Sequence, residues 1–303
     1  MNKLSTIAEA FGMESHESAG SKGAAKAAKA VGAAGGASAT GSANTTKSPH
    51  KAFIPFITCG DPDLATTRAL ILKMQAEGAD LIELGIPFSD PCAEGPVIQE
   101  ANIRALAEGI CTDDIFALVE DLTQVTPLVH VPLVFMTYAN VVFSYGPERF
   151  MKRCQEVGIQ GIILPDVPFE EREEFLPYCE KHGVALISLI APTSKDRIEK
   201  IARAAQGFVY LVSSMGTTGE RSEIRGDLAD MVHEIKRYTS IPCAIGFGIS
   251  TPDQARKMAA IADGVIVGSA IVKLVGKYGK DAPAEVGRFV KDMKTACLTA
   301  DAK

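Results

Sequence analysis

The sequence has 303 residues, of which 47% are hydrophobic, and a formal net charge of −6. This length accommodates one large α/β domain or two smaller ones, with enough apolar side chains for a large core. The acidic balance argues against a nucleic-acid partner, and no apolar run is long enough to cross a membrane. Seven scattered cysteines without a C-x-x-C pair predict a reduced compartment with no disulfide framework. We therefore expect a soluble, cytoplasmic protein.

The N-terminal fifty residues differ in composition from the rest of the chain. Apolar side chains at 3–4 residue spacing predict a short amphipathic helix over Asn2–Phe11. Residues 17–47 are almost wholly Ala, Gly, Ser, Thr, Lys and Asn, which cannot bury enough side chain to offset the entropy of ordering. A transit peptide is the alternative interpretation, but acidic residues precede this segment. We predict an N-terminal helix in 1–14, a disordered tether in 15–50 and one catalytic domain in 51–303.

From residue 52 onward, short apolar runs alternate with helix-compatible sequence. Runs that are apolar throughout are typical of parallel strands covered on both faces. The runs are Phe53–Thr58, Leu81–Gly85, Pro132–Met136, Gly161–Leu164, Ala185–Ile190, Phe208–Val212, Cys243–Phe247 and Gly264–Val267. Eight such units over roughly 250 residues predict a single-domain α/β fold, the closed (β/α)8 TIM barrel. An open doubly wound sheet is the competing architecture, but no G-x-G-x-x-G follows the first run.

The segment from Leu81 to Pro96 carries the clearest chemical signal. An apolar run ends in the carboxylate of Glu83, and the Gly/Pro loop after it brings Asp90 and Glu94. Two carboxylates held across a small substrate can exchange protons with two of its atoms. Glu94 and Asp90 also have ordinary interpretations as a solvated loop acid and a cap. All five histidines lie away from the ends of the runs, so we predict proton transfer by carboxylates, with no metal site.

The last two runs end in small residues that suit phosphate. The seventh is followed by Gly246-Phe247-Gly248 and the eighth by Gly268-Ser269, where a helix is expected to begin. Backbone N–H groups at such a helix start can bind an anion, and barrels often hold phosphate after strands seven and eight. The sixth run leads into a Gly/Thr/Ser loop over 213–221 that is suited to closing over a ligand. Each glycine taken alone is better explained as a turn residue, but two glycine-rich exits on neighbouring final strands favour phosphate binding.

Residues 52–273 closely resemble the α subunit of tryptophan synthase. The matching segments are Phe53–Pro62, Glu83–Pro96, Met136–Asn140, Leu164–Pro168, Tyr210–Gly219, Gly246–Ile249 and Gly268–Ser269. They cover about seven of the eight expected units in the family's order. The resemblance implies retro-aldol cleavage of indole-3-glycerol phosphate to indole and glyceraldehyde 3-phosphate.

The resemblance also implies roles for particular residues. Glu83 corresponds to the family's acid/base, Tyr210 to a residue beside it, and Glu94 to a second carboxylate that stabilises the indole nitrogen. The family usually has Asp at the position of Glu94, so this chain adds one methylene there. The residues that match substrate or phosphate contacts are Phe56, Tyr138, Gly219, Phe247, Gly248, Gly268 and Ser269. Asp90 and Thr218 match a pair that latches the loop after the sixth strand.

The family acts as an αββα complex in which indole passes to a β subunit that holds pyridoxal phosphate. The resemblance thus implies a β-subunit partner and no cofactor in this chain. Three alternatives stay open: a free-standing lyase, another phosphate-binding barrel such as a sugar-phosphate isomerase or epimerase, and a non-catalytic regulatory subunit. The last is conceivable because of Glu94, but Glu83 and the phosphate-binding glycines argue against it.

Overall fold

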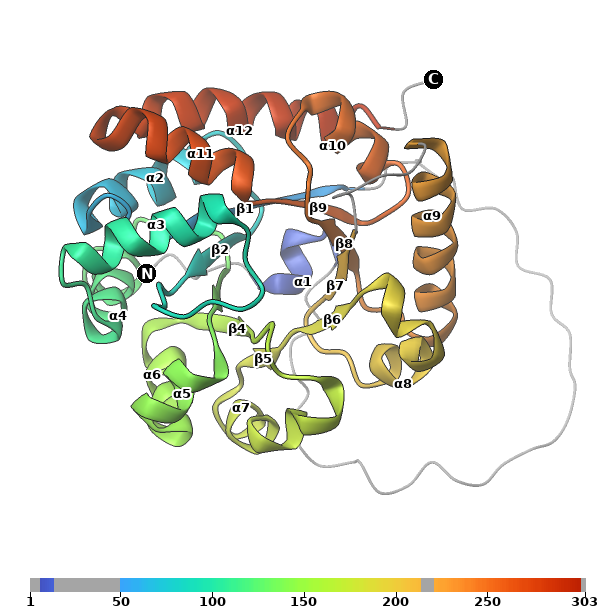
Figure 1. Cartoon of the computed structure of the whole chain (residues 1–303), viewed down its shortest axis with the longest axis horizontal. Coiled ribbons are helices and arrows are strands. Elements are labelled where there is room, and N and C mark those ends of the chain that lie inside the picture. Colours follow the sequence, from blue (N-terminus) through green and yellow to red (C-terminus); the bar gives the residue numbers. More distant parts are fainter. Residues whose placement is uncertain (1–5, 14–49, 214–220, 301–303) are drawn as a thin grey trace, which may run out of the picture.

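Parallel strands arranged as a barrel form the centre of the molecule, and helices surround them (Figure 1). The computed structural model describes residues 6–13, 50–213 and 221–300. The strands are β1 (Ala52–Thr58), β2 (Ile82–Gly85), β3 (Leu133–Met136), β4 (Ile159–Ile163), β5 (Ala185–Leu186), β6 (Ser188–Ile190), β7 (Val209–Val212), β8 (Cys243–Gly246) and β9 (Gly264–Val267). Their order in the sheet is β5-β4-β3-β2-β1-β9-β8-β7-β6, and these neighbours pair in parallel. The predicted (β/α)8 TIM barrel is confirmed.

The predicted fifth strand, Ala185–Ile190, is the one that the structure divides. β5 pairs with β4, whereas β6 pairs with β7. Between them, the N–H of Ile187 donates to the carbonyl of Ile162 at 2.9 Å. β5 and β6 are the two ends of the sheet and are consecutive in the chain, so this run closes the ring of strands. The eight predicted runs therefore correspond to nine short strands.

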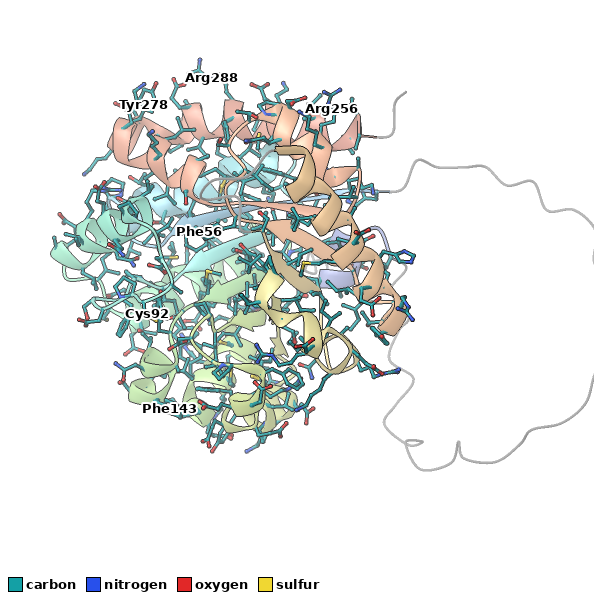
Figure 2. All side chains as sticks on the ribbon, turned by 45° about the vertical axis from the view of Figure 1, so that its right-hand side comes forward. Phe56, Cys92, Phe143, Arg256, Tyr278 and Arg288 are labelled. Carbon is teal, nitrogen blue, oxygen red and sulfur yellow. The ribbon has the colours of Figure 1, made fainter. Side chains whose placement is uncertain are left out.

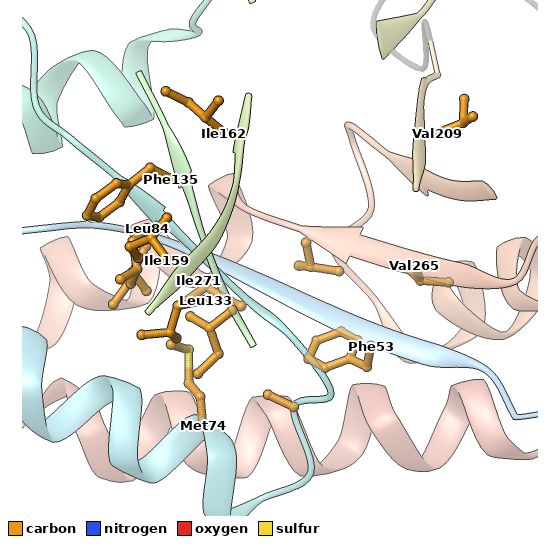
Figure 3. Packing of buried hydrophobic residues seen from close by; sticks show 14 of the residues in the cluster. Phe53, Met74, Leu84, Leu133, Phe135, Ile159, Ile162, Val209, Val265 and Ile271 are labelled. Atoms are coloured by element: carbon orange, nitrogen blue, oxygen red, sulfur yellow. The ribbon is translucent and has the colours of Figure 1, made fainter. Parts of the chain in front are cut away.

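Apart from the N-terminal α1 (Ile7–Ala10), the helices follow the strands and cover the outside of the ring. They are α2 (Leu64–Ala76), α3 (Pro96–Ala107), α4 (Thr112–Glu120), α5 (Ala139–Tyr145), α6 (Pro147–Val157), α7 (Leu176–His182), α8 (Ile198–Arg203), α9 (Arg221–Tyr238), α10 (Pro252–Ala259), α11 (Ser269–Tyr278) and α12 (Ala282–Leu298). Most of the buried apolar side chains lie between the strands and these helices. Figure 3 shows this packing, with Met74 of α2 and Leu133 of β3 in the same cluster.

The N-terminal helix α1 packs against the interior of the barrel (Figure 1). Ile7 and Phe11 are buried in a cluster with Phe208, which immediately precedes β7 and whose ring centroid lies 5.7 Å from that of Phe11. Phe11 also approaches Gly264 at the start of β9. The helix therefore covers the mouth where strands begin and leaves the opposite mouth for the site.

The predictions for the N-terminal segment are tested only in part. Of the predicted helix Asn2–Phe11, the described portion forms α1 over Ile7–Ala10, with Thr6 and Glu9 making a capping box. The predicted tether, residues 15–50, lies outside the described residues except for His50. The division of the chain at residues 14 and 50 stays a prediction.

Candidate active site

A cavity of about 180 Å³ opens at the carboxyl ends of the strands. An engineered cavity of about 150 Å³ is enough to bind benzene, so this one has room for an aromatic ring. Its walls come from β1, β2, β3, β7 and β9, the loops after β4 and β8, the loop before α3, and the start of α11. The lining includes Phe56, Glu83, Ala93, Glu94, Gly95, Ile98, Met136, Pro165, Tyr210, Phe247, Gly248, Ile249, Ser250, Ile266, Gly268, Ser269 and Ala270.

Glu83 lies on β2, between β1 and β3. Its backbone is in register with Phe56 and Val134, which places the side chain within the ring of strands. The side chain is fully buried, and neither carboxylate oxygen has a hydrogen-bond partner among the described residues. Burial without a partner disfavours the charged form and raises the pKa of Glu83 to about 8. Glu83 can therefore hold or release a proton near neutral pH.

Tyr210 of β7 is buried beside Glu83. Burial raises its pKa, and the negative charge of Glu83 raises it further. Gly246, at the end of the neighbouring strand β8, makes room for the tyrosine ring. A Cβ atom at that position would lie 2.7 Å from Cζ of Tyr210. The phenol stays neutral in this setting, so it can act as a hydrogen-bond donor.

Phe56 lies on β1, in register with Glu83 of β2, and near the middle of the molecule in Figure 2. A Cβ at Gly85 would lie 2.6 Å from Cζ of Phe56, so glycine is required there for the ring to lie in this place. Gly268 adjoins the same ring from the side of β9, where a Cβ would lie 3.4 Å from Cδ1 of Phe56. Glycines at strand ends thus shape an apolar floor next to Glu83.

Glu94 faces the cavity from the loop that precedes α3. It is half-buried, and the Nδ2 amide of Asn102 donates to its Oε2 at 2.8 Å. Burial raises the pKa of Glu94, and hydrogen bonds from Asn102 and Tyr138 oppose that rise. Tyr138 also accepts the N–H of Ala93 at 3.1 Å, which ties the loop to the barrel. This acid is therefore positioned by polar contacts as well as by burial.

The rim opposite Glu94 is built from strained and small residues. Phe247 has φ +86° although it is not glycine, and Gly248 follows with φ +74°. The hydroxyl of Ser213 donates to the carbonyls of Gly246 and Phe247, at 3.0 and 2.8 Å, and so holds this turn. Strain of this kind is found where the surrounding structure fixes it, often at functional sites. Ser269 begins the ten-residue helix α11 at the same rim.

The comparisons with known proteins decide the family. A family profile described as tryptophan synthase alpha chain matches residues 42–298. The tryptophan synthase alpha chain of Lacticaseibacillus casei is 53% identical over 247 residues, which is 82% of this chain and 92% of that protein. The chain belongs to the tryptophan synthase alpha chain family. Among solved structures, the tryptophan synthase subunit alpha from Campylobacter jejuni has a TM-score of 0.74 at 35% identity, covering 80% of this chain and 96% of that one. The corresponding subunit from Legionella pneumophila has a TM-score of 0.73 at 36% identity, covering 82% of this chain and 92% of that one.

Most site residues expected from the resemblance to the tryptophan synthase alpha chain line this one cavity. They are Phe56, Glu83, Glu94, Tyr210, Phe247, Gly248, Gly268 and Ser269. Tyr138 instead lies behind the loop, with its hydroxyl on Ala93 and its ring centroid 5.2 Å from that of Phe88. Asp90 is exposed, outside the lining, and accepts the Ser89 hydroxyl at 2.5 Å. Thr218 and Gly219 lie outside the described residues, so the Asp90–Thr218 latch stays a prediction.

Asn102, the partner of Glu94, was not expected from the sequence. A signal was present, because Asn102 lies on the buried face of α3 together with Ile98, Ala101 and Ala105. A polar amide on an otherwise apolar helix face needs a polar partner. Gly85 and Gly246 were likewise not expected to be the glycines that admit the two aromatic rings.

Metal ligation and membrane spanning have no support in the part of the chain that the structure describes. No group of three or more His, Cys, Asp or Glu side chains there is arranged to hold a metal ion. None of the described helices is long and apolar enough to cross a membrane.

Proposed function

We propose that this chain cleaves indole-3-glycerol phosphate to indole and glyceraldehyde 3-phosphate by a retro-aldol reaction, as a carbon–carbon lyase of tryptophan biosynthesis. The observation that carries the proposal is the pairing of Glu83 and Glu94 on one apolar cavity. One acid has a pKa near neutrality, and the other is held by an amide. The glycine-rich exits of β8 and β9 supply a rim suited to the phosphate.

Each acid has a distinct task in this reaction. Protonated Glu83 gives its proton to C3 of the indole ring, which becomes positively charged. The carboxylate of Glu94 stabilises the ring N–H during that step. Glu83, now a carboxylate, takes the proton of the side-chain hydroxyl while the carbon–carbon bond breaks. The bonding electrons return to the ring, a carbonyl forms on the departing aldehyde, and Glu83 ends as it began.

The cavity walls suit the two parts of the substrate. Phe56, Ile98 and Met136 provide apolar contact for the indole ring. The phosphate would then meet the turn at Gly248 and the first backbone N–H groups of α11, with no bulky side chain at Gly268. Tyr210 would donate a hydrogen bond near Glu83 and so assist the second proton transfer.

We further propose that the chain acts with a tryptophan synthase β subunit. Related solved structures include the tryptophan synthase of Mycobacterium tuberculosis, with 31% identity and a TM-score of 0.71 over 82% of this chain. The contact would involve the loop over 87–95 and the region of Asn140. Figure 2 shows Phe143, which is 49% exposed, at the periphery near that region. Pyridoxal phosphate would belong to the β subunit, and the lyase chemistry above uses only side chains of this chain.

The deciding experiment measures indole release from indole-3-glycerol phosphate by the purified chain, with and without a β subunit. Glu83→Gln is expected to lower turnover by about 10²- to 10⁴-fold and Glu94→Gln by about 10²-fold. Glu108→Gln, which changes an exposed acid at the end of α3, is the matched control and should keep wild-type turnover.

The outcomes separate the proposed complex from two of the alternatives left open by the sequence. Turnover that rises with the β subunit supports the proposed complex, whereas turnover unaffected by it indicates a free-standing lyase. Tight substrate binding without turnover would contradict the proposal and indicate a regulatory subunit.

A further inference from the structure

A second cavity, of about 280 Å³, lies beside the active site at the point where the barrel closes. It is lined by the loop after β4, by β5 and β6, and by residues just before and within α8, which are neighbours in Figure 1. Pro165 is the residue that lines both cavities. The two spaces are therefore adjacent but built from different walls.

Arg172 brings a buried positive charge to this second cavity. Its side chain is on the short 3-10 helix Phe169–Glu174, and the residue is only 9% exposed. One guanidinium nitrogen, Nη1, donates to the carbonyl of Ala204 at 3.1 Å, and Cζ lies 5.2 Å from the ring centroid of Phe169. Nε is buried and has no hydrogen-bond partner among the described residues. A buried guanidinium that lacks a counter-ion is costly unless a ligand supplies one.

The other charges around the cavity already have partners. Arg197 forms an ion pair with Glu170 at 3.0 Å. Both oxygens of Asp166 accept the N–H of Ala139, each at 3.1 Å. Within the residues that the structure describes, no carboxylate lies within 4 Å of the Arg172 guanidinium, so it is the charge left over. The hydroxyls of Ser188 and Ser194 also line the cavity.

We propose that this second cavity binds a small monocarboxylate with an apolar or aromatic body. The planar guanidinium of Arg172 matches a carboxylate, and the serine hydroxyls can donate to it. The rest of the wall is largely aliphatic, with Leu164, Leu186, Leu189 and Ile201, and it suits an apolar body. The carboxylate of Asp166, which also lines the cavity, repels a doubly charged phosphate more strongly than a monocarboxylate. Occupancy would act on the active site through the shared Pro165.

The test measures binding of benzoate to the full chain by isothermal titration calorimetry, with benzamide as the uncharged isostere and inorganic phosphate as a second probe. Benzoate is expected to bind, and the affinities of benzamide and phosphate are expected to be at least 10-fold lower than that of benzoate. Arg172→Gln should weaken benzoate by about 10- to 100-fold, the effect of losing hydrogen bonds to a charged group. Arg172→Lys keeps the positive charge but lacks the planar guanidinium, so its affinity for benzoate should lie between those of the wild type and Arg172→Gln.

Two further variants serve as controls for the binding measurement. Ser188→Leu leaves Arg172 in place but narrows the cavity, so it should also weaken benzoate even if Arg172→Gln does not fold. Glu94→Gln removes a negative charge from the first cavity, so it should leave benzoate binding unchanged if the ligand occupies the second cavity. Equal affinity for benzoate and benzamide, equal affinity in folded Arg172→Gln and wild type, or tighter binding in Glu94→Gln would each overturn the inference. Because the readout is binding, its failure is distinguishable from failure of the proposed lyase reaction.

Discussion

Glu83 and Glu94 face the same cavity, but the chain holds them by different means. Glu83 is on the buried strand β2, its side chain is fully buried where it lines the cavity, and no described residue hydrogen-bonds to it. Glu94 is on a loop, half-buried, with an amide from α3 on its carboxylate. Burial alone raises the pKa of the first acid, whereas in the second, hydrogen bonds hold the carboxylate in place and oppose the rise in pKa that burial causes. We call these the strand half and the loop half of the site.

The largest effect is expected from removing the buried charge in the strand half. The folded pKa of Glu83 is about 8 against an ordinary value of 4.5, so the folded state binds more protons than the unfolded state between these values. The free energy of unfolding of the wild type should therefore fall as pH rises from about 4.5 to about 8, by up to about 4 kcal/mol from this group. The glutamine of Glu83→Gln cannot ionise, so the free energy of unfolding of this variant should lack this part of the pH dependence.

Urea unfolding at several pH values from 5 to 9 checks this expectation. At each pH, the free energy of unfolding of Glu83→Gln is subtracted from that of the wild type, because the other groups titrate equally in both proteins. Glu108→Gln, on the surface, should keep the wild-type slope. Parallel pH profiles for wild type and Glu83→Gln would show that Glu83 finds a compensating partner in solution.

A smaller effect is expected from Asn102→Ala in the loop half. Burial raises the pKa of Glu94 and the hydrogen bond from Asn102 lowers it, so the variant should have a higher pKa at Glu94. The acidic limb of the kcat/KM profile for indole release should then move to higher pH, and turnover at pH 7 should fall about 10-fold. Stability should change by only about 1 kcal/mol.

Gln99→Ala is the matched control for that variant. The Nε2 amide of Gln99 donates to the main-chain carbonyl of Glu94 at 2.8 Å, so this change loosens the same loop without touching the carboxylate. It should lower turnover without moving the acidic limb. An identical shift of the pH profile in both variants would mean that loop position, and not the hydrogen bond, sets the pKa of Glu94.

The strand half could be predicted from the sequence far better than the loop half. Apolar runs locate parallel strands, and the carboxyl ends of such strands meet at one mouth, so Glu83, Gly248 and Gly268 were expected together. The prediction failed at Ala185–Ile190 because ring closure gives Ile187 a different partner from Ser188. An apolar run contains no information about which neighbour each of its residues will meet.

Contacts in the loop half depend on how separate elements approach one another. The Nδ2 amide of Asn102, on the buried face of α3, reaches the carboxylate of Glu94 eight residues earlier in the chain, and this contact depends on the path that the loop takes before the helix begins. Tyr138 was expected around the substrate from the family resemblance alone, and its contact with Ala93 could not be read from spacing. The hydrogen bond from Asn102 to Glu94, which stands where the family resemblance implies Asp, could likewise not be read from the sequence.

The smallest effect concerns the strained turn at Phe247, which lies between Gly246 and Gly248. Phe247→Ala and Phe247→Gly both remove a ring that is 51% exposed and lines the cavity, so both should raise KM to a similar degree. Only glycine relieves the φ of +86°, and Phe247→Gly should therefore be more stable than Phe247→Ala by about 1 kcal/mol in urea unfolding. At an ordinary position the order is reversed, because glycine loses more backbone entropy on folding. If alanine proves the more stable, the turn relaxes without the ring, and the aromatic contact with the cavity, not the Ser213 hydroxyl, holds the strain.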